Sequence, residues 1–146
     1  MHKTLAIGAD HRGYFYKEQL KKISQFGGCS VTWIDVGVKS AERADYPVPA
    51  HAAVEEIKNG KVQGAVLLCG SGVGMAIAAN RFPGIYAAVV WEPIVARIAK
   101  EDDNANVLSL SADYVDFKTT VQCVEEWLNA TFKEGRYAFR LSLIDR

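Results

Sequence analysis

The stretch VLLCGSGVGMAIAANRF, residues 66–82, decides the fold of this chain. An apolar run ends at Cys69, three glycines follow at alternate positions, and a segment of helix-forming composition begins. A short apolar run suits a strand buried on both faces of a parallel sheet, and the glycines suit a tight turn into a helix. The stretch therefore predicts a strand–loop–helix unit with a thiol at the start of the loop.

The same alternation of strand and helix extends from this unit in both directions. The predicted strands cover residues 4–10, 30–37, 64–70, 85–91 and 106–111, and the predicted helices cover residues 13–26, 48–58, 73–80, 93–101 and 116–130. Parallel strands need crossover connections, and helices supply them. The pattern therefore predicts an α/β fold in which a five-stranded parallel sheet is covered by helices on both faces.

The length and composition indicate one domain, and its charge gives it no general affinity for nucleic acid or anionic membranes. The chain has 146 residues, of which 49% are apolar, and this suffices for a single core. Lys plus Arg and Asp plus Glu both number 17, so no net positive field favours nucleic acid or an anionic membrane surface. No basic leader with a long apolar stretch and no membrane-spanning run is found, so a cytoplasmic location is expected.

Two features fall outside the strand–helix alternation. The domain is expected to cover residues 1–132, and the tail at residues 133–146 is either a frayed end or an arm that reaches a partner subunit. The three cysteines, Cys29, Cys69 and Cys123, are far apart and lack metal-ligand spacing, which argues against disulfides and structural zinc.

The glycine loop at residues 70–74 suits an anion, because it exposes backbone N–H groups at a helix N-terminus. The named glycine motifs nevertheless fail. A dinucleotide-binding GxGxxG would need glycine at Met75, a P-loop would need Lys and then Ser or Thr after Gly74, and a GxSxG hydrolase motif would need glycine at Cys69. Nucleotide binding and serine hydrolysis are therefore disfavoured.

The candidate functional residues gather where predicted strands end, which is where open α/β sheets bind ligands. Cys69 is open to two interpretations: a small apolar end to a buried strand, or a base or nucleophile whose thiolate is stabilised by the helix N-terminus. Asp10 and His11, with Arg12 beside them, could hold sugar hydroxyls and phosphate, and Tyr46 could reach a ligand with its hydroxyl. In the tail, Arg136 and Arg140 lie one helical turn apart, as either an anion clamp or solvated charge.

Five segments together resemble a known family. They are GADHRGYFYKEQL (8–20), ERADYP (42–47), GAVLLCGSGVGMAIAANRFPGIYAAVVWEP (64–93), NANVLSLS (104–111) and EGRYAFR (134–140). Their order and spacing are similar to those of the ribose-5-phosphate isomerase B family, which includes the galactose-6-phosphate isomerase subunits. The resemblance implies a Rossmann-like three-layer α/β/α sandwich and a homodimer in which each active site is completed by the partner's C-terminal arm. It leaves open whether dimers pair into tetramers.

The resemblance also implies a mechanism and a set of site residues. Aldose–ketose isomerisation moves a proton between neighbouring carbons through an enediolate, with neither metal nor redox cofactor. By similarity, Cys69 is the base, Ser71 assists proton movement between the substrate oxygens, and Asp102 occupies the position of the ring-opening acid. The implied substrate-binding residues are Asp10, His11, Tyr46, Gly70, Gly72, Val73, Gly74, Asp103, Arg136 and Arg140.

Two departures from the family pattern bear on the substrate. Asp102 and Asp103 stand where the family usually carries the ring-opening His and a sugar-contacting Asn. A four-carbon aldose 4-phosphate cannot close a furanose ring and needs no such acid; alternatively, Asp102 does that work if Asp103 or burial disfavours its ionisation. Asp113 stands where the family usually has an arginine that helps bind phosphate, which leaves the phosphate to the two tail arginines or to another basic residue such as Arg12.

The expected function is that of a cofactor-free sugar-phosphate isomerase of carbohydrate metabolism, with ribose 5-phosphate and ribulose 5-phosphate of the pentose phosphate pathway as the default pair. The alternatives are an isomerase of a tetrose 4-phosphate or hexose 6-phosphate, and a non-catalytic paralogue that binds sugar phosphate. A third is a hydrolase or transferase with Cys69 as nucleophile and His11 as base.

Overall fold

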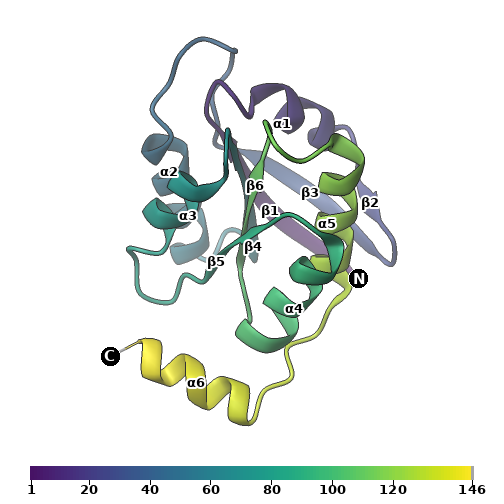
Figure 1. Cartoon of the computed structure of the whole chain (residues 1–146), viewed down its shortest axis with the longest axis vertical. Helices are drawn as coiled ribbons and strands as arrows, with labels where there is room; N and C mark the ends of the chain where they lie inside the picture. The colour runs from purple at the N-terminus through teal and green to yellow at the C-terminus, as the bar shows by residue number, and fades with distance from the viewer. Residues whose placement is uncertain (146) are drawn as a thin grey trace.

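The computed structural model describes residues 1–145 as a mixed α/β fold built on one six-stranded sheet (Figure 1). The strands are β1 (His2–Ala9), β2 (Gln25–Phe26), β3 (Cys29–Asp35), β4 (Gly64–Cys69), β5 (Ala87–Val90) and β6 (Val107–Ser111). The helices are α1 (Tyr14–Lys21), α2 (Pro47–Lys58), α3 (Val73–Ala79), α4 (Pro93–Asp103), α5 (Phe117–Asn129) and α6 (Arg136–Ile144). The strand order is β2-β3-β1-β4-β6-β5, with every pair parallel except β2 and β3.

Helices cover both faces of the sheet, which confirms the predicted three-layer sandwich (Figure 1). Side chains alternate along a strand, so neighbouring residues of β4 enter different cores. Leu68 packs in the core under α1, α4 and α5, whereas Leu67 and Cys69 pack in the core under α2 and α3. The sulfur of Cys69 therefore lies on the α3 side of the sheet, next to the loop that follows it.

The sheet has one strand more than predicted. The helix predicted over residues 13–26 ends at Lys21, and β2 pairs antiparallel with β3 at the edge of the sheet. The pair Gly27 and Gly28 forms the two-residue hairpin loop, and Gly27 has φ of +56°, a value that glycine adopts readily. Phe26 is fully buried and packs edge-on against Trp33, with the ring centroids 6.0 Å apart.

The tail forms a helix rather than a frayed end. In Figure 1, α6 lies below the layers that sandwich the sheet, and its principal contact is with α4. Leu141 is its buried residue, whereas Phe139 and Ile144 are 64% and 66% exposed. None of the helices within residues 1–145 is long and apolar enough to cross a membrane.

Candidate active site

The loops at the carboxyl ends of β1, β4 and β6 enclose a cavity of about 310 Å³. This is the edge where the sequence predicts ligand binding, and three segments distant in sequence meet there because their strands are neighbours in the sheet. Tyr46, at the start of α2, closes one side. The lining residues are Asp10, Arg12, Tyr46, Cys69, Gly70, Ser71, Gly74, Asp113 and Tyr114.

Cys69 ends β4 with its side chain turned toward the glycine loop. The residue is 5% exposed, and its Sγ accepts a hydrogen bond from the backbone N–H of Gly72 at 3.1 Å. Gly72 has φ of +81°, so a side chain at this position would be strained. Ser71 Oγ accepts from the N–H of Val73 at 3.2 Å. The loop thus directs one N–H group at the sulfur, and Ser71 lines the same cavity as Cys69.

Gly74 is required by the aromatic ring of Tyr46. A Cβ at Gly74 would lie 2.6 Å from Cε1 of that ring, closer than any normal contact. Tyr46 is 40% exposed, so its ring covers the first turn of α3 while part of it stays open to the cavity. Because Gly74 has no side chain, the ring of Tyr46 can lie against this turn and line the site.

Asp10 and His11 fix the turn that follows β1. Asp10 is 6% exposed, and its Oδ1 accepts from the backbone N–H groups of Arg12 and Gly13 at 2.9 and 3.1 Å. His11 lies beside the cavity rather than in its lining, and its Nδ1 lies 3.2 Å from the backbone nitrogen and 3.3 Å from the carbonyl oxygen of Ala44. Either ring tautomer of His11 can therefore form a hydrogen bond with the backbone of Ala44.

Four predicted site residues, Asp102, Asp103, Arg136 and Arg140, lie away from the cavity within this chain. Lys133 Nζ donates to Asp102 Oδ1 at 2.7 Å. The guanidinium groups of Arg136 and Arg140 lie 5.1 and 5.3 Å from the ring centroid of Tyr137. A hydrogen bond from Arg136 lowers the pKa of Tyr137. The start of α6 is therefore a cationic cluster on the surface, which we call the α6 cluster.

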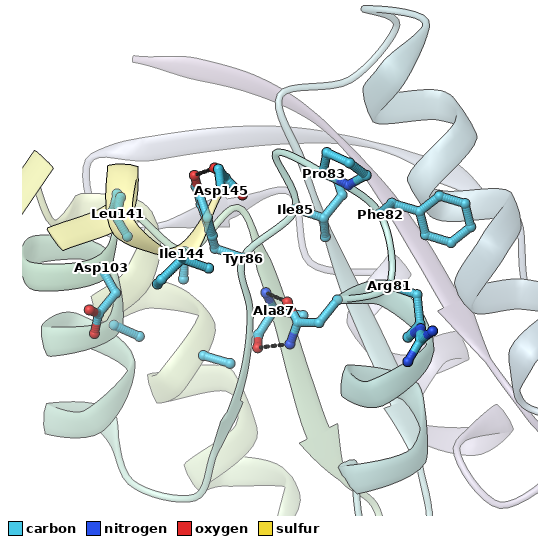
Figure 2. A pocket seen from close by; sticks show the side chains of 14 residues that line it. Arg81, Phe82, Pro83, Ile85, Tyr86, Ala87, Asp103, Leu141, Ile144 and Asp145 are labelled. Carbon is cyan, nitrogen blue, oxygen red and sulfur yellow. Dashed lines mark hydrogen bonds between the residues drawn. The ribbon is translucent and has the colours of Figure 1, made fainter. Parts of the chain in front are cut away.

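Asp103 lines a second and larger cavity of about 740 Å³, which lies between α4, α6 and the segment leading into β5. Figure 2 shows Leu141 and Ile144 of α6 on one wall, with Tyr86 donating a hydrogen bond to Asp145. That bond raises the pKa of Tyr86. The two cavities share no lining residue. The larger one is mostly apolar, and its wall holds no thiol, so we assign the chemistry to the smaller cavity.

Sequence reasoning placed the residues around Asp113 at this edge of the sheet, but it did not single out Tyr114 and did not find the partner of Arg12. The guanidinium of Arg12 forms an ion pair with the carboxylate of Asp113. The available signal for this ion pair was the presence of opposite charges after β1 and β6, the two strands that flank β4. Within residues 1–145, no group of three or more His, Cys, Asp or Glu side chains is placed to hold a metal ion.

Comparison with known proteins gives consistent matches across the chain. The family model described as Ribose/Galactose Isomerase matches residues 5–144. Ribose-5-phosphate isomerase B of Escherichia coli (strain K12) is 36% identical over 142 residues, which are 97% of this chain and 94% of that protein. D-erythrulose-4-phosphate isomerase of Pectobacterium atrosepticum is 33% identical over 141 residues, covering 97% of this chain and 92% of that protein.

Solved structures agree with these matches. A ribose 5-phosphate isomerase of Thermotoga maritima superposes with a TM-score of 0.92 at 36% identity, covering 99% of both chains. Ribose-5-phosphate isomerase B of Mycoplasma genitalium, solved with bound ribulose-5-phosphate, has a TM-score of 0.88 at 32% identity and covers 98% of this chain and 94% of its own.

Proposed function

The chain belongs to the ribose/galactose isomerase family and is an aldose–ketose isomerase of sugar phosphates; on this premise we propose that it interconverts ribose 5-phosphate and ribulose 5-phosphate. The observation that carries the proposal is the Cys69 sulfur, which faces a glycine loop and receives the Gly72 N–H in a cavity of small-molecule size. Relatives named as ribose-5-phosphate isomerases B support the choice of a pentose.

In the proposed mechanism, the Cys69 thiolate removes a proton from C1 of the open-chain ketose. The electron pair forms the C1–C2 double bond of an enediolate, and the thiol then returns the proton to C2. The hydroxyl of Ser71 takes the proton of O1 and delivers its own to O2, which completes the aldose. General base catalysis of this kind contributes about 10²–10⁴ in rate.

The glycine loop supplies the stabilisation of the negative charge that develops on oxygen. In the present arrangement the Gly72 N–H is directed at the sulfur of Cys69, and the Val73 N–H is directed at Ser71 Oγ. We therefore assign the oxyanion to the remaining amides of residues 70–74. Asp10, Tyr46 and His11 are proposed to orient the sugar from the rim.

We further propose that residues 133–146 form an arm that completes the Cys69 cavity of a second copy; residue 146 lies outside the described part of the chain. No residue of α6 is among the described residues that line the cavity of its own chain. The α6 cluster nevertheless presents Arg136 and Arg140 as unburied cations, which suit a phosphate. The exposed Phe139 supplies apolar surface for contact between subunits. A homodimer would place Asp102 and Asp103 near the partner's site together with these arginines.

One observation favours a second substrate class. Asp102 accepts a hydrogen bond from Lys133, so it acts as an acceptor and is poorly suited to donate the proton that opens a furanose ring. A tetrose 4-phosphate, which stays open-chain, would need no such donor. The relative named D-erythrulose-4-phosphate isomerase has a similar sequence over 97% of this chain.

The cysteine hydrolase alternative finds less support. Nucleophilic catalysis by a Cys–His pair needs the two side chains within hydrogen-bond reach. Within residues 1–145, the hydrogen-bond partner found for Cys69 Sγ is the Gly72 N–H, and those found for His11 Nδ1 are the backbone N–H and carbonyl groups of Ala44. We therefore retain the isomerase mechanism.

Proton NMR of ribulose 5-phosphate in heavy water tests the proposal. This ketose is already open-chain, so the measurement separates enolisation from ring opening. Deuterium incorporation at C2 with ribose 5-phosphate appearing would establish the pentose pair. An absence of exchange with this ketose, together with exchange in erythrulose 4-phosphate, would replace the pentose by the tetrose.

A further inference from the structure

The ion pair between Arg12 and Asp113 forms part of the wall of the Cys69 cavity. Arg12 lies in the turn between β1 and α1, and Asp113 lies in the loop after β6. Their side chains meet in front of Gly70, where a Cβ would lie 2.8 Å from Asp113 Oδ2 and 2.9 Å from Arg12 Nε. Because Gly70 has no side chain, the charged groups of Arg12 and Asp113 can meet over it, directly after Cys69.

Both ends of this ion pair are anchored by the backbone. The N–H of Arg12 donates to the buried carboxylate of Asp10 at 2.9 Å. The N–H of Asp113 donates to the carbonyl of Gly70 at 3.1 Å, and Ser111 Oγ donates to the same carbonyl at 2.6 Å. The ion pair thus joins all three strand-end loops, and its position relative to Cys69 is set by the sheet.

The charges of the cavity single out Arg12. It is the one cationic side chain among the described residues that line the cavity, where Asp10 and Asp113 are anionic. Its side chain is 57% exposed, whereas that of Asp113 is 27% exposed. A guanidinium has five N–H donors, and the contact with one carboxylate oxygen does not occupy all of them.

We propose that Arg12 binds the phosphate group of the sugar phosphate and that Asp113 holds its guanidinium in the direction of the cavity. This inference rests on the proposed function, because it assigns the phosphate contact of the same site. It gives the chain its own phosphate ligand in addition to the cations expected from the partner's arm. Asp113, which repels phosphate by its charge, acts here as a positioning residue.

Affinity for inorganic phosphate, measured by calorimetry on the full chain, tests the contact without requiring turnover. We expect Arg12→Ala to weaken phosphate binding at least tenfold and to raise the KM of the sugar phosphate by a similar factor, with a smaller change in kcat. Arg12→Lys, which keeps the charge, should recover part of the loss. Arg97→Ala is the matched control, because Arg97 pairs with Glu126 at 2.7 Å outside the cavity lining.

A double-mutant cycle tests the positioning role. In an Asp113→Ala background the guanidinium is no longer oriented, so Arg12→Ala should weaken phosphate binding less than threefold. Equal losses in both backgrounds would overturn the role of Asp113. Native affinity in the Arg12→Ala/Asp113→Ala protein would overturn the role of Arg12, because the arginine would then only cancel the charge of Asp113.

The two proposals fail in different ways. A native chain that binds phosphate through Arg12 but exchanges no proton of any sugar phosphate would refute the proposed function and keep the phosphate contact. Isomerisation by the native chain, with a KM that is unchanged in the Arg12→Ala variant, would refute the contact and keep the function. Thermal unfolding of each variant excludes loss of the fold as the cause.

Discussion

The backbone N–H of Gly72 points at the sulfur of Cys69 from 3.1 Å, three residues further along the chain. It does so because Gly72 has a left-handed backbone, which turns the chain back over the end of β4. An N–H donor stabilises a thiolate more than a thiol. Cys69, although only 5% exposed, thus has a polar partner for its sulfur and lines the cavity instead of serving only as core.

Replacing Cys69 by alanine removes the proposed base. We expect kcat to fall by about 10²–10⁴ while KM changes little, because proton abstraction and not binding is lost. Steady-state kinetics on ribulose 5-phosphate measures both. A Cys69→Ala enzyme with native kcat would assign the base to another residue.

Cys123 provides a matched control for that measurement. It is buried in α5, and burial raises the pKa of its thiol to about 11. Cys123→Ala should therefore keep its kcat, and the Cys123 thiol should resist iodoacetamide in the native protein. Mass spectrometry of the alkylated protein is expected to find the label on Cys69, and label on Cys123 alone would contradict the assignment.

Gly74→Ala should act through Tyr46. The added methyl group would occupy the place of the ring, and the side chain of Tyr46, a residue that is 40% exposed, can swing outward, so the fold should survive. We expect a rise in KM that matches the rise produced by Tyr46→Ala, with no further rise in the double variant. Gly28→Ala is the control glycine, since its Cβ would meet the Asn129 side chain at an ordinary 3.4 Å. Additive losses in the double variant would show that the two positions act separately.

The sequence predicted the sheet and its helices because apolar periodicity reports burial directly. It missed β2, since residues 25 and 26 continue the pattern of the preceding helix as well as they begin a hairpin. The two glycines that follow decide the matter, and their effect depends on β3 lying alongside. At residues 25 and 26, the helical pattern of the sequence favours one structure and pairing with β3 favours another, and the chain adopts the paired strand.

The site was predictable where one loop carries it and not where several loops meet. The stretch from Cys69 to Gly74 is contiguous, and its spacing alone indicates a thiol beside a turn. The contact between Arg12 and Asp113 joins positions 101 residues apart in numbering (113 minus 12) and depends on the strand order. No sequence period reports such a contact.

Asp35→Asn should destabilise the fold away from the active site. Lys17 is fully buried and donates to Asp35 at 2.6 Å. Loss of this charged acceptor should lower the free energy of unfolding by about 2 kcal/mol in urea titrations. Glu126→Gln, which breaks the exposed pair with Arg97, should change it by less than about 0.5 kcal/mol. An equal effect of the two changes would contradict the structural role of Lys17.

The same variant should show a defined pH dependence. Burial raises the pKa of Asp35, but hydrogen bonds from Lys17 and Lys21 outweigh it, so the pKa lies below its ordinary value. A lowered pKa in the folded state stabilises the fold above the unfolded pKa, and that stabilisation is lost as pH falls through the folded pKa. The difference between native and Asp35→Asn proteins should therefore be constant near neutrality and shrink below about pH 4. A difference that persists to pH 2 would assign it to packing.

Mixing two inactive proteins tests whether the arm serves a partner. A Cys69→Ala chain keeps its arm, and an Arg136→Ala/Arg140→Ala chain keeps its thiol, so each mixed dimer should contain one intact site. After denaturation and refolding of an equal mixture, about a quarter of native activity is expected. A chain with all three changes, refolded with the Cys69→Ala chain, is the control and should recover none. If the arm served the cavity of its own chain, neither mixture would regain activity, because no single chain would hold both the thiol and the arginines.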